Sequence, residues 1–199
     1  MFERFSFAYH VLFLLGLMVV AAAYDLWRRE KKATRPREYS FIWIAGILGG
    51  LVGFANDSIT SSISPEYFIF GKGFETVNDL QWRAGVYGFK AGLSAGVIGG
   101  AICLFVRPTR SGFSTEQMRQ LLKALWMPLV GAVLLGLMLP IVAGGFDPMG
   151  ISASLNSLLN ANQIARFNRV WWIHSGLYAG MAIGLVAMMI RQKGDKPSV

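Results

Sequence analysis

Long apolar segments alternate with short polar ones along this chain, and the alternation predicts its secondary structure. A helix needs about 20 mainly apolar residues to cross the hydrocarbon core of a bilayer, which is roughly 30 Å thick. Five segments reach or approach that length. The predicted helices are about 5–26, 39–55, 84–106, 124–144 and 170–190. The sequence therefore predicts an all-α integral membrane protein with a single transmembrane domain over 1–199.

Lysine and arginine are unevenly distributed between the polar segments. Most of the 19 basic residues lie after the first predicted helix, after the third, and in the C-terminal tail. Because basic residues are enriched in cytoplasmic loops, this bias places the N-terminus outside and the C-terminus in the cytoplasm. Segments 56–83 and 145–169 are then outer loops. In the second, apolar residues at helical spacing predict a short helix along the membrane surface.

Composition agrees with a membrane location. The 199 residues are 54% hydrophobic, and the mean hydropathy is +0.46. A net charge of +8 can indicate nucleic-acid binding, but here the basic residues gather between apolar runs and indicate topology instead. The single cysteine, Cys103, excludes an intramolecular disulfide framework. We expect membrane lipid as a partner and no nucleic acid.

Glycines recur every fourth residue in the third and fifth predicted helices. Such stripes let helix backbones approach closely, so that van der Waals packing holds helices together inside a bilayer. They predict contact with each other or with a partner helix. The glycines concerned are Gly88, Gly92, Gly96, Gly100, Gly176, Gly180 and Gly184.

Ionisable residues collect near the predicted outer surface. At 1.5 Å per residue, His10, Lys90 and His174 lie about 8, 9 and 6 Å inside the membrane. Asp57 and Glu66 begin just above that level. Ionisable groups at membrane depth are costly and face a protein interior or a cavity, so this layer is a candidate site. Its simplest interpretation is structural, with Lys90 paired to Glu66 or Asp57.

Three functional interpretations compete with the structural one. His10, Asp57, Glu66 and His174 are suitable ligands for zinc, iron or copper. His10 and His174 share a depth and are candidate axial ligands of a haem. Alternatively, Glu66 and Lys90 gate the passage of a proton or small solute.

Motifs for soluble-enzyme chemistry are missing from the sequence. It has no glycine-rich phosphate loop, no nucleophile elbow and no metalloprotease helix. Ser114 and Gln117 match a helix capping box before the fourth predicted helix. We therefore expect a non-catalytic membrane subunit that packs with other membrane proteins, through its glycine stripes, to stabilise or assemble a larger complex. A metal or haem protein and a permease are the alternatives.

The first outer loop resembles a signature of uncharacterised bacterial multi-pass membrane proteins. In that signature an Asp followed by Ile or Val and Thr leads to Glu-Tyr-Phe, and the last helix carries a histidine, which His174 matches. The matching loop residues are Asp57, Ile59, Thr60, Ile63, Ser64, Pro65, Glu66, Tyr67 and Phe68. Lys72 and the Gly88-Phe89-Lys90 run depart from the family pattern. The resemblance implies a bacterial inner-membrane location, without an activity.

Overall fold

The computed structural model describes residues 2–75, 78–106, 113–143, 146–147 and 150–194, which are mostly helical and contain no strand. Five of the helices are long and apolar enough to cross a membrane, as the sequence predicted. The elements are α1 (Phe2–Arg29), η1 (Glu30–Lys32), α2 (Arg35–Ile63), η2 (Tyr67–Gly71), α3 (Leu80–Val106), α4 (Thr115–Ala124), α5 (Trp126–Ala143), α6 (Ile151–Leu155) and α7 (Ala161–Gly194).

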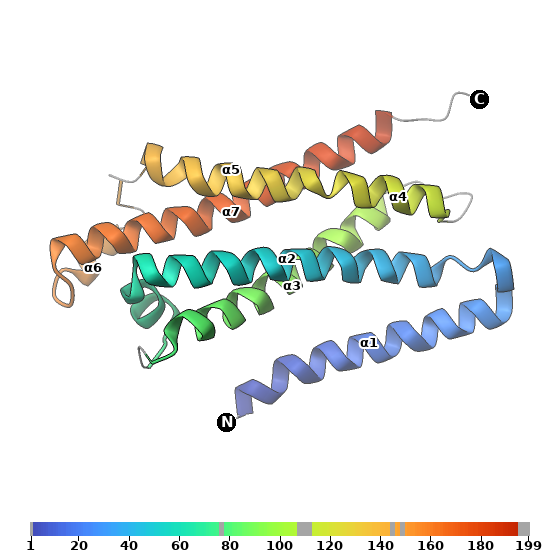
Figure 1. Ribbon diagram of the computed structural model, residues 1–199, viewed down its shortest axis with the longest axis horizontal. Helices are drawn as coiled ribbons and strands as arrows, with labels where there is room; N and C mark the ends of the chain where they lie inside the picture. Colours follow the sequence, from blue (N-terminus) through green and yellow to red (C-terminus); the bar gives the residue numbers. More distant parts are fainter. Residues whose placement is uncertain (1, 76–77, 107–112, 144–145, 148–149, 195–199) are drawn as a thin grey trace.

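Two closely packed helix pairs form the body of the molecule. Helix α2 pairs with α3, and α5 pairs with α7 (Figure 1). A Cβ atom added to Gly92 would run into the carbonyl oxygen of Gly49, and one added to Gly180 would run into that of Gly131. Each pair therefore depends on glycine at its line of closest approach.

Each glycine stripe packs on a partner helix within the chain. The two stripes do not meet each other: the α3 stripe faces α2, and the α7 stripe faces α5. Both stripes are occupied by contacts within the chain.

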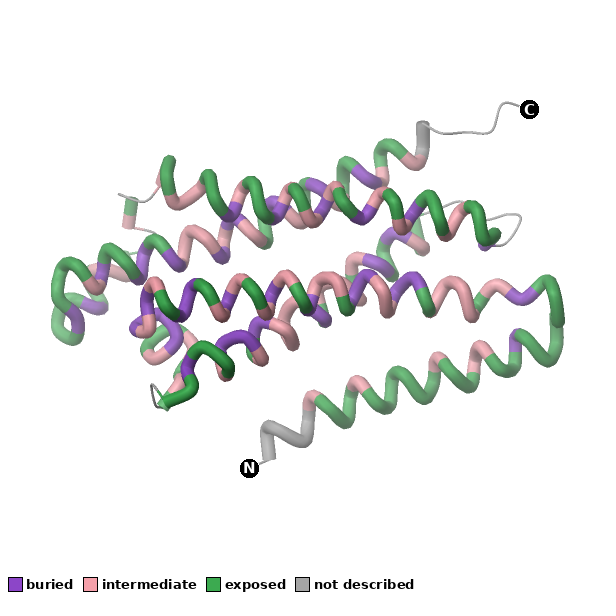
Figure 2. Tube along the Cα trace, viewed as in Figure 1, coloured by how far each residue is buried: buried purple, intermediate pink, exposed green. Residues whose placement is uncertain are grey.

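The two helix pairs meet mainly at their ends. One apolar cluster, at what we call the η2 end, joins η2, α3, α6 and α7 through residues such as Phe68, Ala84 and Val170. The other, at the α4 end, joins α2, α3, α4 and α7 through residues such as Phe41 and Met188. Figure 2 shows buried positions at both ends of the bundle. Between the clusters, the facing sides of the two pairs are less tightly packed.

Helix α1 lies apart from the rest and contacts α2 near their connection. None of the residues in its apolar window is buried within the chain (Figure 2). The connection is fixed by Asp25, whose Oδ2 accepts hydrogen bonds from the backbone N–H groups of Thr34 (2.8 Å) and Arg35 (3.0 Å). Asp25 thus caps the N-terminus of α2, where Thr34 makes no side-chain cap of its own.

The helix boundaries correct the predicted outer loops. Helix α2 continues to Ile63, so 56–63 is helix instead of loop. Its polar residues fit because the hydroxyls of Thr60 and Ser61 donate to the carbonyls of Asn56 (2.8 Å) and Ser58 (2.9 Å). Helix α7 begins at Ala161, nine residues before the predicted start at 170. Residues 144–145 and 148–149, at the predicted end of the fourth helix and in the second loop, lie outside the described residues.

Two other local predictions are confirmed. The short helix expected in the second loop is α6. Ser114 and Gln117 form the capping box at the start of α4, with each side chain bonded to the other residue's backbone N–H. The chain then passes through Leu125 into α5, so that α4 and α5 together form the fourth candidate span.

Candidate functional site

His174 of α7 is the centre of the candidate site, at the η2 end of the bundle. Its side chain is almost fully buried, and its Nε2 lies 2.9 Å from Oδ1 of Asp57 on α2. The Asn56 amide donates to the same carboxylate oxygen at 2.9 Å and lies 3.3 Å from His174 Nε2. This contact joins the two helix pairs through polar groups.

The hydrogen bonds of His174 determine where its protons lie. Its Nδ1 is 2.9 Å from the carbonyl oxygen of Val170, which can only accept, so Nδ1 carries a proton. The close approach of Nε2 to Asp57 then requires one more proton between those two atoms. The pair is either an imidazolium with a carboxylate or a neutral imidazole with a carboxylic acid. In both forms it has no net charge.

Two aromatic rings from η2 enclose the imidazole. Tyr67 stacks on it with ring centroids 4.8 Å apart, and Phe68 meets it edge-on at 6.1 Å. The π-helical turn of η2 follows directly after Pro65 and Glu66 and places both rings against α7. Burial raises the pKa of Tyr67, and the nearby Asp57 carboxylate adds to the increase, so its hydroxyl stays protonated. The two rings cover the imidazole on the side of η2.

Glu66 forms a second polar contact beside this one. Its Oε1 accepts from Arg166 of α7 at 3.0 Å, and its Oε2 accepts from the Ser64 hydroxyl at 2.9 Å. Partial burial by itself would raise the pKa of Glu66. Hydrogen bonds from its own backbone N–H and Ser64, with the positive charge of Arg166, outweigh burial and hold the pKa below its usual value. Glu66 is therefore ionised in the folded protein near neutral pH.

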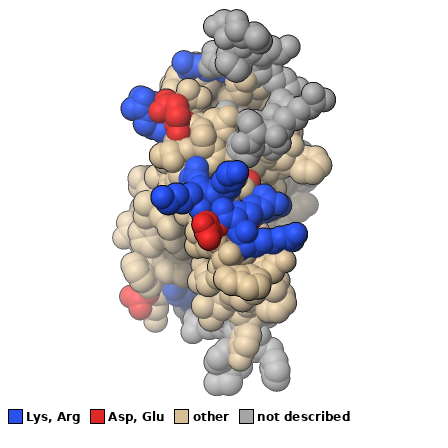
Figure 3. All heavy atoms as spheres, turned by 90° about the vertical axis from the view of Figure 1, so that its right-hand side faces the viewer, with Lys and Arg blue, Asp and Glu red and all other residues tan. Residues whose placement is uncertain are grey.

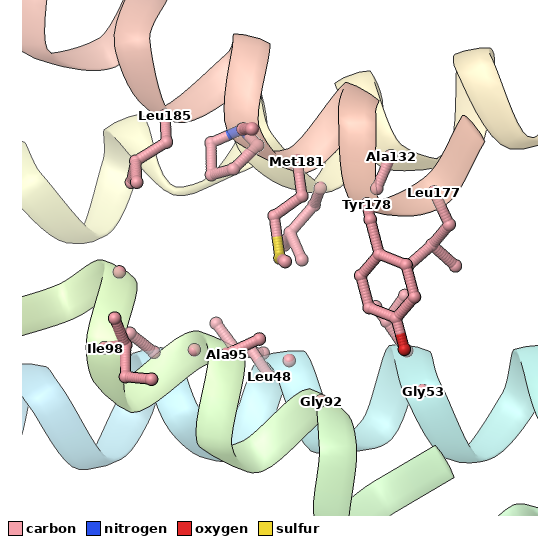
Figure 4. A pocket seen from close by; sticks show the side chains of 18 of the residues that line it. Leu48, Gly53, Gly92, Ala95, Ile98, Ala132, Leu177, Tyr178, Met181 and Leu185 are labelled. Atoms are coloured by element: carbon pink, nitrogen blue, oxygen red, sulfur yellow. The ribbon is translucent and has the colours of Figure 1, made fainter. Parts of the chain in front are cut away.

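A cleft of about 360 Å³ lies between the two helix pairs, below the Asp57–His174 pair. Its walls come from α2, α3, α5 and α7, and the lining is almost entirely apolar, including Leu48, Ala95, Met181 and Leu185 (Figure 4). The polar residues are confined to the η2 end of the lining and are Asn56, Asp57, His174 and Tyr178. No Lys or Arg is among the described residues that line the cleft.

Tyr178 marks the point where the lining changes from polar to apolar. It follows His174 by one helical turn on the same face of α7. Figure 4 shows its ring extending from α7 toward α2, with the hydroxyl near Gly53. The cleft therefore has one end with hydrogen-bonding groups and an apolar length leading away from it.

The structure separates some of the residues that the sequence grouped. Of the four predicted metal ligands His10, Asp57, Glu66 and His174, only Asp57 and His174 bond to each other. Within the described chain, no three His, Cys, Asp or Glu side chains lie together so that they could hold a metal ion. Both ring nitrogens of His174 bond within the protein, Nδ1 to Val170 and Nε2 to Asp57. His10 lies exposed on α1.

Glu66 and Lys90, which the sequence predicted to form an ion pair, have different partners in the structure. Glu66 bonds Arg166, while the Lys90 ammonium lies 5.7 Å from the centre of the Phe7 ring on α1. Lys90 is half-buried and connects α3 to α1. In the described chain it has no ion pair with Asp57 or Glu66 and therefore does not hold the first outer loop in place.

Sequence reasoning missed Arg166, Asn56 and Tyr178. A signal for the first was available: Asn160 and Gln163 form a reciprocal capping box, with bonds of 3.0 Å in both directions. That box starts α7 early and puts Arg166 on the same helix as His174, two turns before it. Asn56 and Tyr178 carried no comparable signal, since their roles depend on how the helix pairs are placed.

Comparisons with protein-family models, curated proteins and solved structures gave no match.

Proposed function

We propose that this chain is a non-catalytic multi-pass membrane protein that binds an elongated apolar molecule in the cleft between its helix pairs. The observation that carries the proposal is the cleft itself, an apolar cavity with its few polar groups at one end. Pockets of this size and composition are the usual sites for hydrophobic ligands. Buried ionisable residues at membrane depth mark functional sites, and the Asp57–His174 pair lines this cleft at one end.

The shape of the cleft favours a chain-like ligand over a compact one. At 1.5 Å per residue, the stretch of α2 from Ala45 to Asp57 that lines it spans about 18 Å. Gly99 of α3 forms part of the wall, and it has no side chain to narrow the space in front of Leu185. An acyl or isoprenoid chain has the required length and width, and the surrounding bilayer supplies such molecules.

We place the protein in a bacterial inner membrane, with its N-terminus outside and its C-terminus in the cytoplasm. The end of the molecule at the α1–α2 connection gathers lysine and arginine (Figure 3). These include Arg28, Arg29, Lys31, Lys32, Arg35 and Arg37. Basic residues stay on the cytoplasmic side during insertion, so this orientation puts the Asp57–His174 pair toward the outer side.

Photolabelling with an alkyl diazirine in nanodiscs tests the proposed binding. Ala95 of α3 lines the cleft, so Ala95→Phe should fill it and reduce labelling of cleft residues severalfold. Ala101 is exposed on the same helix and does not line the cleft, so Ala101→Phe is the matched control. Uniform labelling around the bundle, unchanged in Ala95→Phe, would refute the proposal.

Helix α1 supports a second candidate function, a subunit that stabilises or assembles a larger membrane complex. Its apolar window is wholly unburied within the chain, which suits a helix that docks on another membrane protein. A photocrosslinker at Leu17 of α1 in native membranes should then give a defined protein adduct. The same crosslinker at Ile183, which is exposed on α7, should give lipid adducts only. If Leu17 also gives lipid adducts only, α1 faces lipid.

A further inference from the structure

The hydroxyl of Tyr178 borders the cleft and makes no hydrogen bond to the described residues of the chain. Beside it, both ring nitrogens of His174 and the Oδ1 atom of Asp57 already bond within the protein. A phenol in an apolar setting gains most when its O–H finds an acceptor. The Tyr178 hydroxyl is therefore a hydrogen-bond donor available to a ligand in the cleft, one helical turn from the Asp57–His174 pair.

The charges around the cleft limit the head group further. Asp57 and His174 neutralise each other, and neither lysine nor arginine lines the described cleft. A carboxylate or phosphate placed there would lose its hydration without gaining a cation. A quaternary ammonium would likewise find no unpaired carboxylate. An uncharged head avoids both costs.

We propose that the ligand is an uncharged long-chain amphiphile whose head carries an oxygen acceptor, a ketone or a hydroxyl, bound by the Tyr178 hydroxyl. This inference rests on the proposed function, because it assigns the head group of a molecule whose chain fills the cleft. The head lies beside Tyr178, below the Asp57–His174 pair. The chain runs past Ala95 and Met181 toward Leu185 at the α4 end.

The order of polar and apolar residues along α7 supports this orientation. His174 and Tyr178 are followed on the same helix by Met181 and Leu185, each about one turn further along. A ligand inserted the other way would bury its head among Leu125, Leu129 and Leu185. A reversed ligand would leave both its own oxygen and the Tyr178 hydroxyl unsatisfied.

Competition against the alkyl diazirine in nanodiscs tests the head group. The competitors are a long-chain methyl ketone, an alkane and a fatty acid carboxylate of equal chain length, each compared at equal mole fraction in the bilayer. We expect the ketone to compete several-fold better than the alkane or the carboxylate. A net hydrogen bond corresponds to roughly 2- to 10-fold in affinity, so Tyr178→Phe should remove the advantage of the ketone and leave competition by the alkane unchanged.

Tyr87 provides the control, since it is similarly exposed, lies on α3 and does not line the cleft. Tyr87→Phe should keep the preference for the ketone. The head-group inference is overturned if ketone and alkane compete equally in the unaltered protein, if the carboxylate competes best, or if Tyr178→Phe keeps the preference. Absence of cleft labelling by the diazirine in the unaltered protein overturns the proposed function instead, and this inference with it.

Discussion

His174 Nε2 lies 2.9 Å from Asp57 Oδ1, although the two residues are 117 positions apart in the chain. They belong to different helix pairs, so their contact fixes how α2 and α7 face each other. Tyr67 and Phe68 cover it from the side of η2. Asp57 and His174 both line the cleft at its η2 end.

Removing the imidazole should be strongly destabilising. His174→Phe keeps an aromatic ring against Tyr67 but leaves the Asp57 carboxylate buried without its partner. Breaking a buried pair in this way costs about 3 kcal/mol or more. Thermal and denaturant unfolding in mild detergent measures the change.

The double variant Asp57→Leu/His174→Phe separates this explanation from simple loss of contacts. With both polar partners replaced by apolar side chains, no buried charge is left unpaired. The double variant should therefore be more stable than His174→Phe alone. A double variant that loses the sum of the two single effects would show that the residues act independently.

The α2–α3 pair should depend on glycine at its closest approach. Gly92→Ala places a methyl group against the backbone of Gly49, which cannot rotate away, and should cost about 2 kcal/mol. Gly99→Ala on the same helix meets only the Leu185 methyls at 3.7 Å and should change the unfolding temperature little. Equal unfolding temperatures for the two variants would contradict the observed helix contact.

The contact of Glu66 with Arg166 predicts a pH-dependent difference. The pKa of Glu66 is lowered on folding, so its ionised form stabilises the fold above 4.5, the value of an unperturbed Glu, and this contribution is lost as the pH falls through the lowered pKa. Glu66→Gln should cost about 1 kcal/mol at pH 7, because Arg166 is partly exposed. The two proteins should converge in stability in acid.

Glu116→Gln is the control for this experiment, since Glu116 pairs with Arg119 at an exposed position. It should unfold like the unaltered protein at every pH. A stability deficit of Glu66→Gln that stays constant from neutral pH into acid would show that the charge of Glu66 is not responsible.

Asp25 should hold the connection between α1 and α2. Asp25→Ala removes the acceptor for the N–H groups of Thr34 and Arg35, and the loss of this cap destabilises the start of α2. We expect tryptic cleavage in 28–32 to accelerate severalfold, measured in detergent under native conditions. Asp25→Asn keeps an acceptor oxygen and should be cleaved nearly as slowly as the unaltered chain. Equal cleavage of Asp25→Ala and Asp25→Asn would argue against the cap.

The sequence predicted the five long helices because their apolar length is a local property. It failed at the ends of α2 and α7, where polar residues looked like loop. Thr60 and Ser61 satisfy their hydroxyls on the helix itself, and the Asn160–Gln163 capping box starts α7 early. Local hydrogen bonds, rather than hydropathy, decide these boundaries.

The candidate site was predicted in part. Depth along the helices placed Asp57 and His174 at one level, and the structure joins them. Depth gives no lateral position, so the same reasoning grouped His10 and Lys90, which lie on or toward α1, with this pair. The cleft could not be foreseen, because it arises from how two helix pairs pack against each other at their ends.

Native mass spectrometry of the protein, extracted gently from its own membrane, tests the central claim most directly. The binding account predicts a defined uncharged amphiphile retained with the unaltered chain and with Ala101→Phe, and lost from Ala95→Phe. The same mixture of bulk phospholipids on all three proteins, with no molecule specific to the open cleft, would contradict it.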